Sequence, residues 1–274
     1  MTSAAAGSTA RVEARDGRDD WDQHWSGYAD SASDNPAQHF RHRIVRRLVA
    51  RAGPTRILDI GCGQGDLLRM LADASPGAEL FGVELSRTGV ERSVAKVPAA
   101  DVRQVDLLSP SAEVRMRDIG ADVATCVEVL EHLDDPGRFL RNVRHALAPG
   151  ATLIVTVPGG RRSKFDLMIG HRRHYAPMNL HDLLVHAGFD VQHVWGAGFP
   201  FFNLYRWVVI ARGDRLAADV DASSRSRLAA SVMAVFDVLL RCSRTRGRYG
   251  WQTVAVATWP ASTRTPRSSV LTAR

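Results

Sequence analysis

Short apolar runs alternate with amphipathic segments through most of this chain of 274 residues. The apolar runs predict strands, and the segments with apolar residues at helical spacing predict helices. In chain order, the expected strands cover residues 56–60, 79–83, 102–105, 122–127, 151–157, 189–195 and 253–259. Between them, helices are expected at 66–74, 87–96, 137–146 and 178–187. Strands separated by helices require crossover connections, so the pattern predicts an α/β fold with a mostly parallel sheet and helices on both faces.

Two further helices are expected before the first strand. Trp21, Trp25 and Tyr28 share one helical face, and residues 39–52 carry apolar side chains at helical spacing before Gly53. This spacing predicts an amphipathic helix in each segment.

A helical insert, residues 197–250, is expected before the last strand. It contains helical patterns near 203–212 and 227–240, and the second is apolar almost all round. Such a helix is typically buried, here in the chain's own core, in a homodimer or against lipid. The loop at 159–177 is long for a connection, which favours a functional lid.

Composition narrows the class of protein. Hydrophobic residues make up 45% and charged residues 24%, as in soluble globular proteins. Small polar residues at 1–20 and 261–274 predict flexible tails around one domain at 21–260. No apolar run reaches the roughly 20 residues of a transmembrane helix, and the N-terminus lacks the apolar region of a signal peptide. We therefore expect a cytoplasmic protein.

The charged and sulfur-containing residues indicate neither nucleic-acid binding nor a zinc site. The net charge is +7, but the basic residues form no long tract with interleaved aromatic residues. Cys62, Cys126 and Cys242 form no CxxC pair and have no histidines at zinc spacing. We therefore expect reduced thiols and no metal bound by them.

Glycines follow the first predicted strand at every second position. Gly61, Gly63 and Gly65 stand between that strand and a helix, and Asp59 lies near the strand's end. Such a turn lets the backbone approach a ligand closely. The G-x-G-x-G spacing disfavours a nicotinamide-dependent oxidoreductase, whose fingerprint is G-x-G-x-x-G. The aspartate suits a ligand with a positive charge.

Acidic residues also end the next two predicted strands. Glu84 is placed to accept hydrogen bonds from both ribose hydroxyls. Asp106 can accept from an exocyclic amine, and the backbone N–H of Leu107 can face a purine nitrogen. Together these three strand ends predict a site for adenosine that carries a cationic amino-acid tail.

With these motifs the chain resembles class I S-adenosylmethionine-dependent methyltransferases, especially the branch of ubiquinone-biosynthesis O-methyltransferases. The resemblance rests on LDIGCGQG (58–65), GVELS (82–86), VDLL (105–108), CVEVLEHLDDP (126–136), LAPGATLIVTVPG (147–159) and HRRHYAPMNLHDLLVHAGF (171–189). It implies a Rossmann-like sheet of seven strands, whose last two form an antiparallel hairpin. The cofactor contacts that it implies are Asp59, Gly61, Cys62, Gly63, Gly65, Glu84, Leu85, Asp106, Leu107, Val127 and Glu128.

The resemblance also implies direct transfer of a methyl group to a small-molecule acceptor. We expect a hydroxyl in secondary metabolism or cell-envelope glycan tailoring; nitrogen, carbon and a non-catalytic cofactor-binding partner module are the alternatives. His132, His171 and His174 are the candidate bases, with a structural role for His132 as the other interpretation. The histidine pair in the lid has no carboxylate pair or cysteine nearby in sequence, which argues against a metal.

The predicted lid is rich in basic side chains. Arg172 and Arg173 suit an anionic acceptor, such as a carboxylate or phosphate, although a solvated loop explains them equally. Tyr175, Trp25 and Tyr28 are further candidate acceptor contacts.

Overall fold

The computed structural model describes residues 21–22, 25, 35–212 and 227–261. It contains a seven-stranded sheet with the order β3-β2-β1-β4-β5-β7-β6. The strands are β1 (Arg56–Ile60), β2 (Glu79–Glu84), β3 (Asp101–Gln104), β4 (Ala121–Val127), β5 (Leu147–Pro158), β6 (Asp190–Ala197) and β7 (Gln252–Thr258). Strands β1 to β5 run parallel, whereas β7 is antiparallel to both β5 and β6. The predicted α/β fold with its C-terminal antiparallel hairpin is therefore confirmed.

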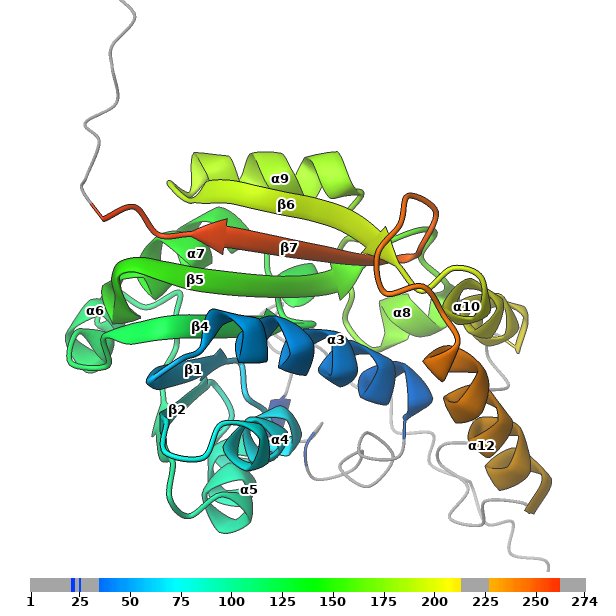
Figure 1. Cartoon of the computed structure of the whole chain (residues 1–274), viewed down its shortest axis with the longest axis horizontal. Helices are drawn as coiled ribbons and strands as arrows, with labels where there is room; N and C mark the ends of the chain where they lie inside the picture. Colours follow the sequence, from blue (N-terminus) through cyan, green and yellow to red (C-terminus); the bar gives the residue numbers. More distant parts are fainter. Residues whose placement is uncertain (1–20, 23–24, 26–34, 213–226, 262–274) are drawn as a thin grey trace, which may run out of the picture.

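Helices cover both faces of this sheet (Figure 1). The described helices are α3 (Pro36–Ala52), α4 (Asp66–Ala74), α5 (Arg87–Lys96), α6 (Ala112–Met116), α7 (Pro136–Val143), α8 (Lys164–Met168), α9 (Pro177–His186), α10 (Phe201–Arg212) and α12 (Arg227–Arg241), with 3-10 turns η1 (Leu130–His132) and η2 (Arg144–Ala146). One core joins α3 and α4 to the sheet, and another joins α6, α7 and α9 to its opposite face. Alternate residues of β1 enter the two cores: Ile57 faces α3, and Leu58 faces α7.

Local sequence signals explain where the helices begin and end. Asn35 caps α3 by accepting a hydrogen bond from the backbone N–H of Ala37, and Gly53 ends the helix in the left-handed conformation. Ser86 caps α5 through the N–H of Gly89. Proline occupies the first turn of α3, α7 and α9, where its missing N–H leaves no hydrogen bond unmade.

Several local predictions need correction. The helix expected at 137–146 ends at Val143 and continues as the 3-10 turn η2. The segment 159–177 is not one long loop, because Ser163 and Asp166 form a capping box that starts α8. Helix α6 was not predicted, since five residues give too little periodicity to recognise. The tails 1–20 and 262–274 and most of the predicted first helix, Tyr28 included, lie outside the described residues.

The described helices of the insert between β6 and β7 pack as a third core; residues 213–226 of the insert lie outside the described residues. Its helices α10 and α12 lie beside α3, at the end of the sheet where the parallel strands finish (Figure 1). Phe202 is buried against Phe40, with ring centroids 5.2 Å apart, and Leu240 is also buried. The insert therefore adds a wall at the carboxyl ends of the strands.

Candidate active site

The glycine turn lies at the carboxyl edge of the sheet, directly after β1. Gly61, Gly63 and Gly65 all have positive φ angles, 69°, 54° and 84°. The N–H of Gly61 donates to the carbonyl of Val83 at 2.8 Å, which ties the turn to β2. A Cβ atom at Gly63 would overlap the ring of Trp25, so only glycine suits this close approach.

Glu84, at the end of β2, is a buried carboxylate with both oxygens positioned. One oxygen accepts from the N–H of Gly63 and the other from the N–H of Ser86, each at 2.9 Å. Burial raises the pKa of Glu84, and these backbone hydrogen bonds oppose the rise. The carboxylate is thereby fixed at the cavity wall, where it can accept further hydrogen bonds.

A cavity lies above this turn, and six of the predicted cofactor residues line it. They are Gly61, Glu84, Leu85, Asp106, Leu107 and Glu128. Asp59, Cys62, Gly63, Gly65 and Val127 are not part of the lining. Apolar side chains complete the walls, among them Val105, Val129, Leu133 and Phe139. An apolar cavity with a buried carboxylate at its wall fits a nucleoside, whose base is flat and apolar and whose ribose donates hydrogen bonds.

The described part of the N-terminal segment also lies at this cavity. Trp21 and Trp25 line it, and the Trp21 ring stacks edge-on against His132, with centroids 4.8 Å apart. Asp22 accepts from the Ser86 hydroxyl at 2.5 Å and from the Thr88 N–H at 2.9 Å. Trp25, predicted as an acceptor contact, thus lies against the glycine turn; Tyr28 is outside the described residues.

Asp59 is held inside the protein and does not line the cavity. Its carboxylate accepts from the Thr125 hydroxyl at 2.7 Å. Burial raises the pKa of Asp59 to about 7; the Thr125 hydrogen bond lowers it, and the negative charge of Glu84 raises it. At this pKa, a nearby cationic ligand would favour the ionised form.

Glu128 follows β4 in a strained conformation and lines the same cavity. Its φ is +57°, in the left-handed region that non-glycine residues rarely adopt. Its carboxylate accepts from Thr156 at 3.2 Å and Gln252 at 2.8 Å, and pairs with Arg41 at 3.6 Å. Sequence reasoning missed these three partners, because they come from β5, β7 and α3 and no local motif links them.

The three candidate histidines lie together beyond Glu128. Only His132 lines the cavity; His171 is buried behind it, with ring centroids 4.7 Å apart. Nδ1 of His171 lies 3.1 Å from Nε2 of His174. Burial lowers the pKa of His171 to about 2, and it also lowers that of His174. Both rings are therefore neutral and weak bases.

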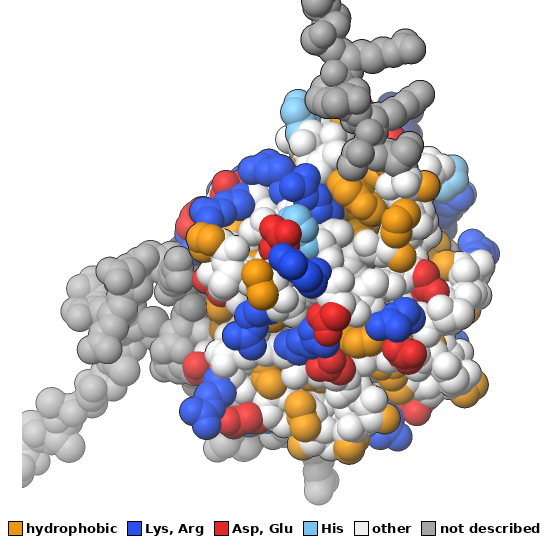
Figure 2. All heavy atoms as spheres, turned by 90° about the vertical axis from the view of Figure 1, so that its left-hand side faces the viewer, with side chains coloured by type: hydrophobic (Ala, Val, Ile, Leu, Met, Phe, Trp, Pro, Cys, Tyr) orange, Lys and Arg blue, Asp and Glu red, His pale blue; other side chains and the backbone are white. Residues whose placement is uncertain are grey.

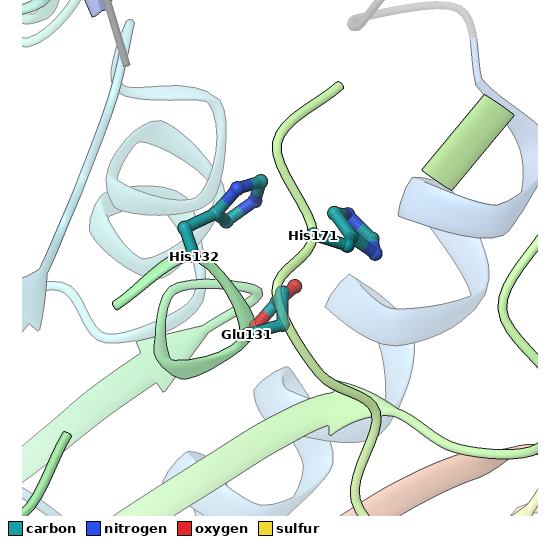
Figure 3. Close-up of side chains that lie close together, drawn as sticks. All are labelled: Glu131, His132 and His171. Carbon is teal, nitrogen blue, oxygen red and sulfur yellow. The ribbon is translucent and has the colours of Figure 1, made fainter. Parts of the chain in front are cut away.

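Carboxylates lie directly beside these rings, contrary to the sequence argument. Glu131 adjoins His132 and His171 (Figure 3), and Asp166 adjoins His171 and His174. In each group, one candidate ligand atom per residue lies within 4.8 Å of the others. Two carboxylates therefore lie beside these rings in space, although the lid histidines have no carboxylate pair nearby in sequence. Asp166 comes from α8, and Glu131 precedes the lid by a whole strand and helix.

The other predicted acceptor residues make internal bonds. Arg172 donates to the carbonyl of His132 and pairs with Asp134 at 2.7 Å, while Arg173 donates to the Asp134 carbonyl at 3.1 Å. Tyr175 is buried, and its hydroxyl donates to the Leu130 carbonyl at 3.1 Å. These side chains fix the loop after β4 against the segment before α9.

The amino edge of the parallel strands carries mixed charge. On this side of the molecule, basic and acidic side chains stand next to one another (Figure 2). Arg56 pairs with Glu79 at 3.0 Å, and Arg103 pairs with Asp118 at 2.7 Å. These charges are therefore compensated within the protein.

Among the described residues, no helix has the length and apolar character to cross a membrane.

Comparison with known proteins agrees with this geometry. A family model described as "Methyltransferase domain" matches residues 37–194. A probable S-adenosylmethionine-dependent methyltransferase of Mycolicibacterium smegmatis is 29% identical over 71% of this chain and 77% of that protein. A ubiquinone biosynthesis O-methyltransferase of Azorhizobium caulinodans is 32% identical over 68% of this chain and 75% of that protein.

Solved structures share the fold. The chain is similar to a putative sarcosine dimethylglycine methyltransferase from Galdieria sulphuraria, with a TM-score of 0.56 and 13% identity over 82% of this chain and 87% of the other. It is also similar to the [4+2]-cyclase SpnF, with a TM-score of 0.52 and 22% identity over 80% of both chains. Both likenesses concern the fold alone. From the matching family model, the chain belongs to the methyltransferase domain family, and the predicted methyltransferase is confirmed.

Proposed function

We propose that this methyltransferase moves the methyl group of S-adenosylmethionine to a hydroxyl of a small molecule. The observation that carries the proposal is that two carboxylates, from different strand ends, line one cavity. Glu84 lies on the wall formed by β1 and β2, and Glu128 lies on the wall formed by the loop after β4. The first suits the ribose of the cofactor, and the second suits the proton of an acceptor.

The residues on the β1–β2 wall fit the cofactor by their chemistry. Glu84 would accept hydrogen bonds from the ribose hydroxyls, and Asp106 with Leu107 would contact the adenine. Asp59, in its ionised form, would favour the cationic end. When bound, S-adenosylmethionine supplies an activated methyl group on a sulfonium sulfur, and the sulfur keeps the electron pair when the carbon–sulfur bond breaks.

Glu128 is the residue that we assign to proton removal. It lines the cavity, and Thr156 and Gln252 hold its carboxylate in one orientation. This carboxylate would take the hydroxyl proton of the acceptor as its oxygen is methylated. His132 lines the same cavity and is the second candidate. His171 and His174 are weaker candidates, because they do not line it.

Hydroxyl acceptors are favoured over nitrogen and carbon by the similarity to an O-methyltransferase over two thirds of the chain. We also propose that residues 159–177 act as an acceptor lid, with the insert 197–250 as the neighbouring wall. An anionic acceptor remains a prediction that rests on Arg173, since Arg172 already pairs with Asp134. A homodimer and a cytoplasmic location remain predictions as well.

The proposal is tested by methyl transfer with a labelled cofactor. The full chain is incubated with S-adenosylmethionine that carries a ¹³C methyl group and with phenols, alkyl alcohols and amines of matched size. We expect the label on oxygen, which the carbon chemical shift separates from label on nitrogen or carbon. Label on nitrogen or carbon alone, or no transfer to any acceptor, would overturn the hydroxyl assignment.

A further inference from the structure

Glu131 is buried without any hydrogen bond to its carboxylate among the described residues. Its relative exposure is 0%, and neither carboxylate oxygen has a partner. Burying an unpaired carboxylate is costly, so such groups are usually paired with a cation or bound to a metal. The backbone fixes its position, because the Glu131 carbonyl accepts from the N–H of Arg172 at 2.8 Å. Figure 3 shows the carboxylate directed between the rings of His132 and His171.

The three side chains offer a donor set that transition metals prefer. A carboxylate with two imidazoles is a donor set that binds zinc and related divalent ions. One ligand atom from each of Glu131, His132 and His171 lies within 4.8 Å of the others. In a tetrahedral zinc site, bonds of about 2.0–2.2 Å place ligand atoms about 3.3 Å apart.

Residues on the far side of His171 orient its ring. Its Nδ1 lies 3.1 Å from Nε2 of His174, whose Nδ1 in turn lies 3.3 Å from the Gly160 carbonyl. Asp166 lies beside both rings and pairs with Arg206 of α10 at 2.6 Å. Hydrogen bonds to the outer nitrogen of a metal-binding histidine usually orient it in this way.

We propose that Glu131, His132 and His171 form a binding site for one divalent transition-metal ion of the zinc class, beside the part of the cavity that His132 lines. The role of the ion rests on the proposed function, whereas its binding does not. A carboxylate is in general a weak base for a hydroxyl. An ion that binds the acceptor oxygen lowers the pKa of that hydroxyl, so that Glu128 suffices to take the proton.

The experiment titrates zinc into the full chain after removal of metal with a chelator, and repeats the titration with cobalt, which reports its ligands by visible absorption. We expect one ion per chain. Glu131→Gln and His171→Asn should each lower the zinc affinity by more than about 100-fold, because loss of an outer partner alone costs about 10–100-fold. His174→Gln should fall within that smaller range. His193→Ala, at an exposed histidine of β6, is the matched control and should leave the affinity unchanged.

Wild-type chain that binds no zinc, or that binds it equally well in Glu131→Gln and His171→Asn, would overturn the proposal; Glu131 would then be a protonated structural side chain. If a variant does not fold, X-ray absorption of the zinc-loaded wild type decides, because the site requires two imidazoles and one carboxylate on the ion. Binding of S-adenosylhomocysteine, measured in parallel, separates the two hypotheses. If the wild type binds the cofactor but no zinc, only the metal site is contradicted. If the wild type does not bind the cofactor, the proposed function is contradicted.

Discussion

The two sides of the cavity treat their buried charges differently. On the cofactor side, the carboxyl ends of β1 and β2, Glu84 accepts two backbone hydrogen bonds and Asp59 accepts one from Thr125. The acceptor side comprises residues 128–132 and, packed behind them, residues 160–175. There, both oxygens of Glu131 and one oxygen of Asp166 have no hydrogen-bond partner among the described residues. The contrast teaches that the protein itself satisfies the buried carboxylates of the cofactor side, whereas on the acceptor side it holds Glu128 but leaves Glu131 unsatisfied.

Of the substitutions proposed here, Glu128→Gln on the acceptor side should have the largest effect, which is a loss of turnover. Loss of a positioned proton acceptor costs typically 10²–10⁴-fold in rate. We expect turnover at saturating cofactor and acceptor to fall within that range, because glutamine keeps the shape of the side chain but cannot take a proton. Affinity for S-adenosylhomocysteine, the control, should stay within a few-fold of wild type. Turnover close to wild type would move the base to His132.

Phe202→Ala tests whether the wall beside the acceptor side belongs to the same cooperative unit as the sheet. Phe202 is buried between Phe40 and Tyr205. Removing such a ring typically costs about 3–5 kcal/mol in the free energy of unfolding. Leu204→Ala, exposed on the same helix, should cost less than about 0.5 kcal/mol. Equal effects of the two substitutions in urea denaturation would show that the insert unfolds separately.

The pH dependence of the stability of Asp59→Asn tests whether Asp59, on the cofactor side, is buried and protonated. The pKa of Asp59 is raised from 3.8 to about 7 by burial, so the folded state holds a proton that the unfolded chain releases between these values. Asp59 therefore contributes stability below about pH 4, and this contribution is lost as pH rises to 7.

Asparagine cannot ionise, so the variant does not undergo this loss of stability between about pH 4 and pH 7. The stability of Asp59→Asn relative to wild type should rise across that window by up to about 4 kcal/mol, since one pKa unit corresponds to about 1.4 kcal/mol. Urea denaturation at a series of pH values measures it. A difference that stays constant with pH would refute a buried, protonated Asp59.

The double substitution Arg172→Gln and Arg173→Gln should have the smallest effect. Arg172 pairs with the exposed Asp134, and such pairs contribute at most about 1 kcal/mol to stability. If the acceptor is anionic, its KM should rise several-fold while that of a neutral analogue stays unchanged. Arg161→Gln, at an exposed arginine of the same segment, is the control. An unchanged KM for the anionic acceptor would remove this prediction.

The same contrast explains what sequence could and could not predict. Asp59, Glu84 and Asp106 each follow or end an apolar strand, so parallel topology alone brings them to one edge. The acceptor side depends on tertiary packing. Glu131 and His171 are far apart in the chain, and Gln252 reaches Glu128 from the last strand. No local pattern predicts such contacts, and for this reason the proximity of Glu131 to His171 was missed.

Cofactor binding by the wild type and by Glu84→Ala tests the central claim most directly. We predict that calorimetry shows one molecule of S-adenosylhomocysteine bound per wild-type chain. Charge-assisted hydrogen bonds contribute about 1.5–3 kcal/mol, so Glu84→Ala should weaken binding by about 10–150-fold. No binding to the wild type, or equal binding by the folded variant, would contradict a nucleoside site at the ends of β1 and β2.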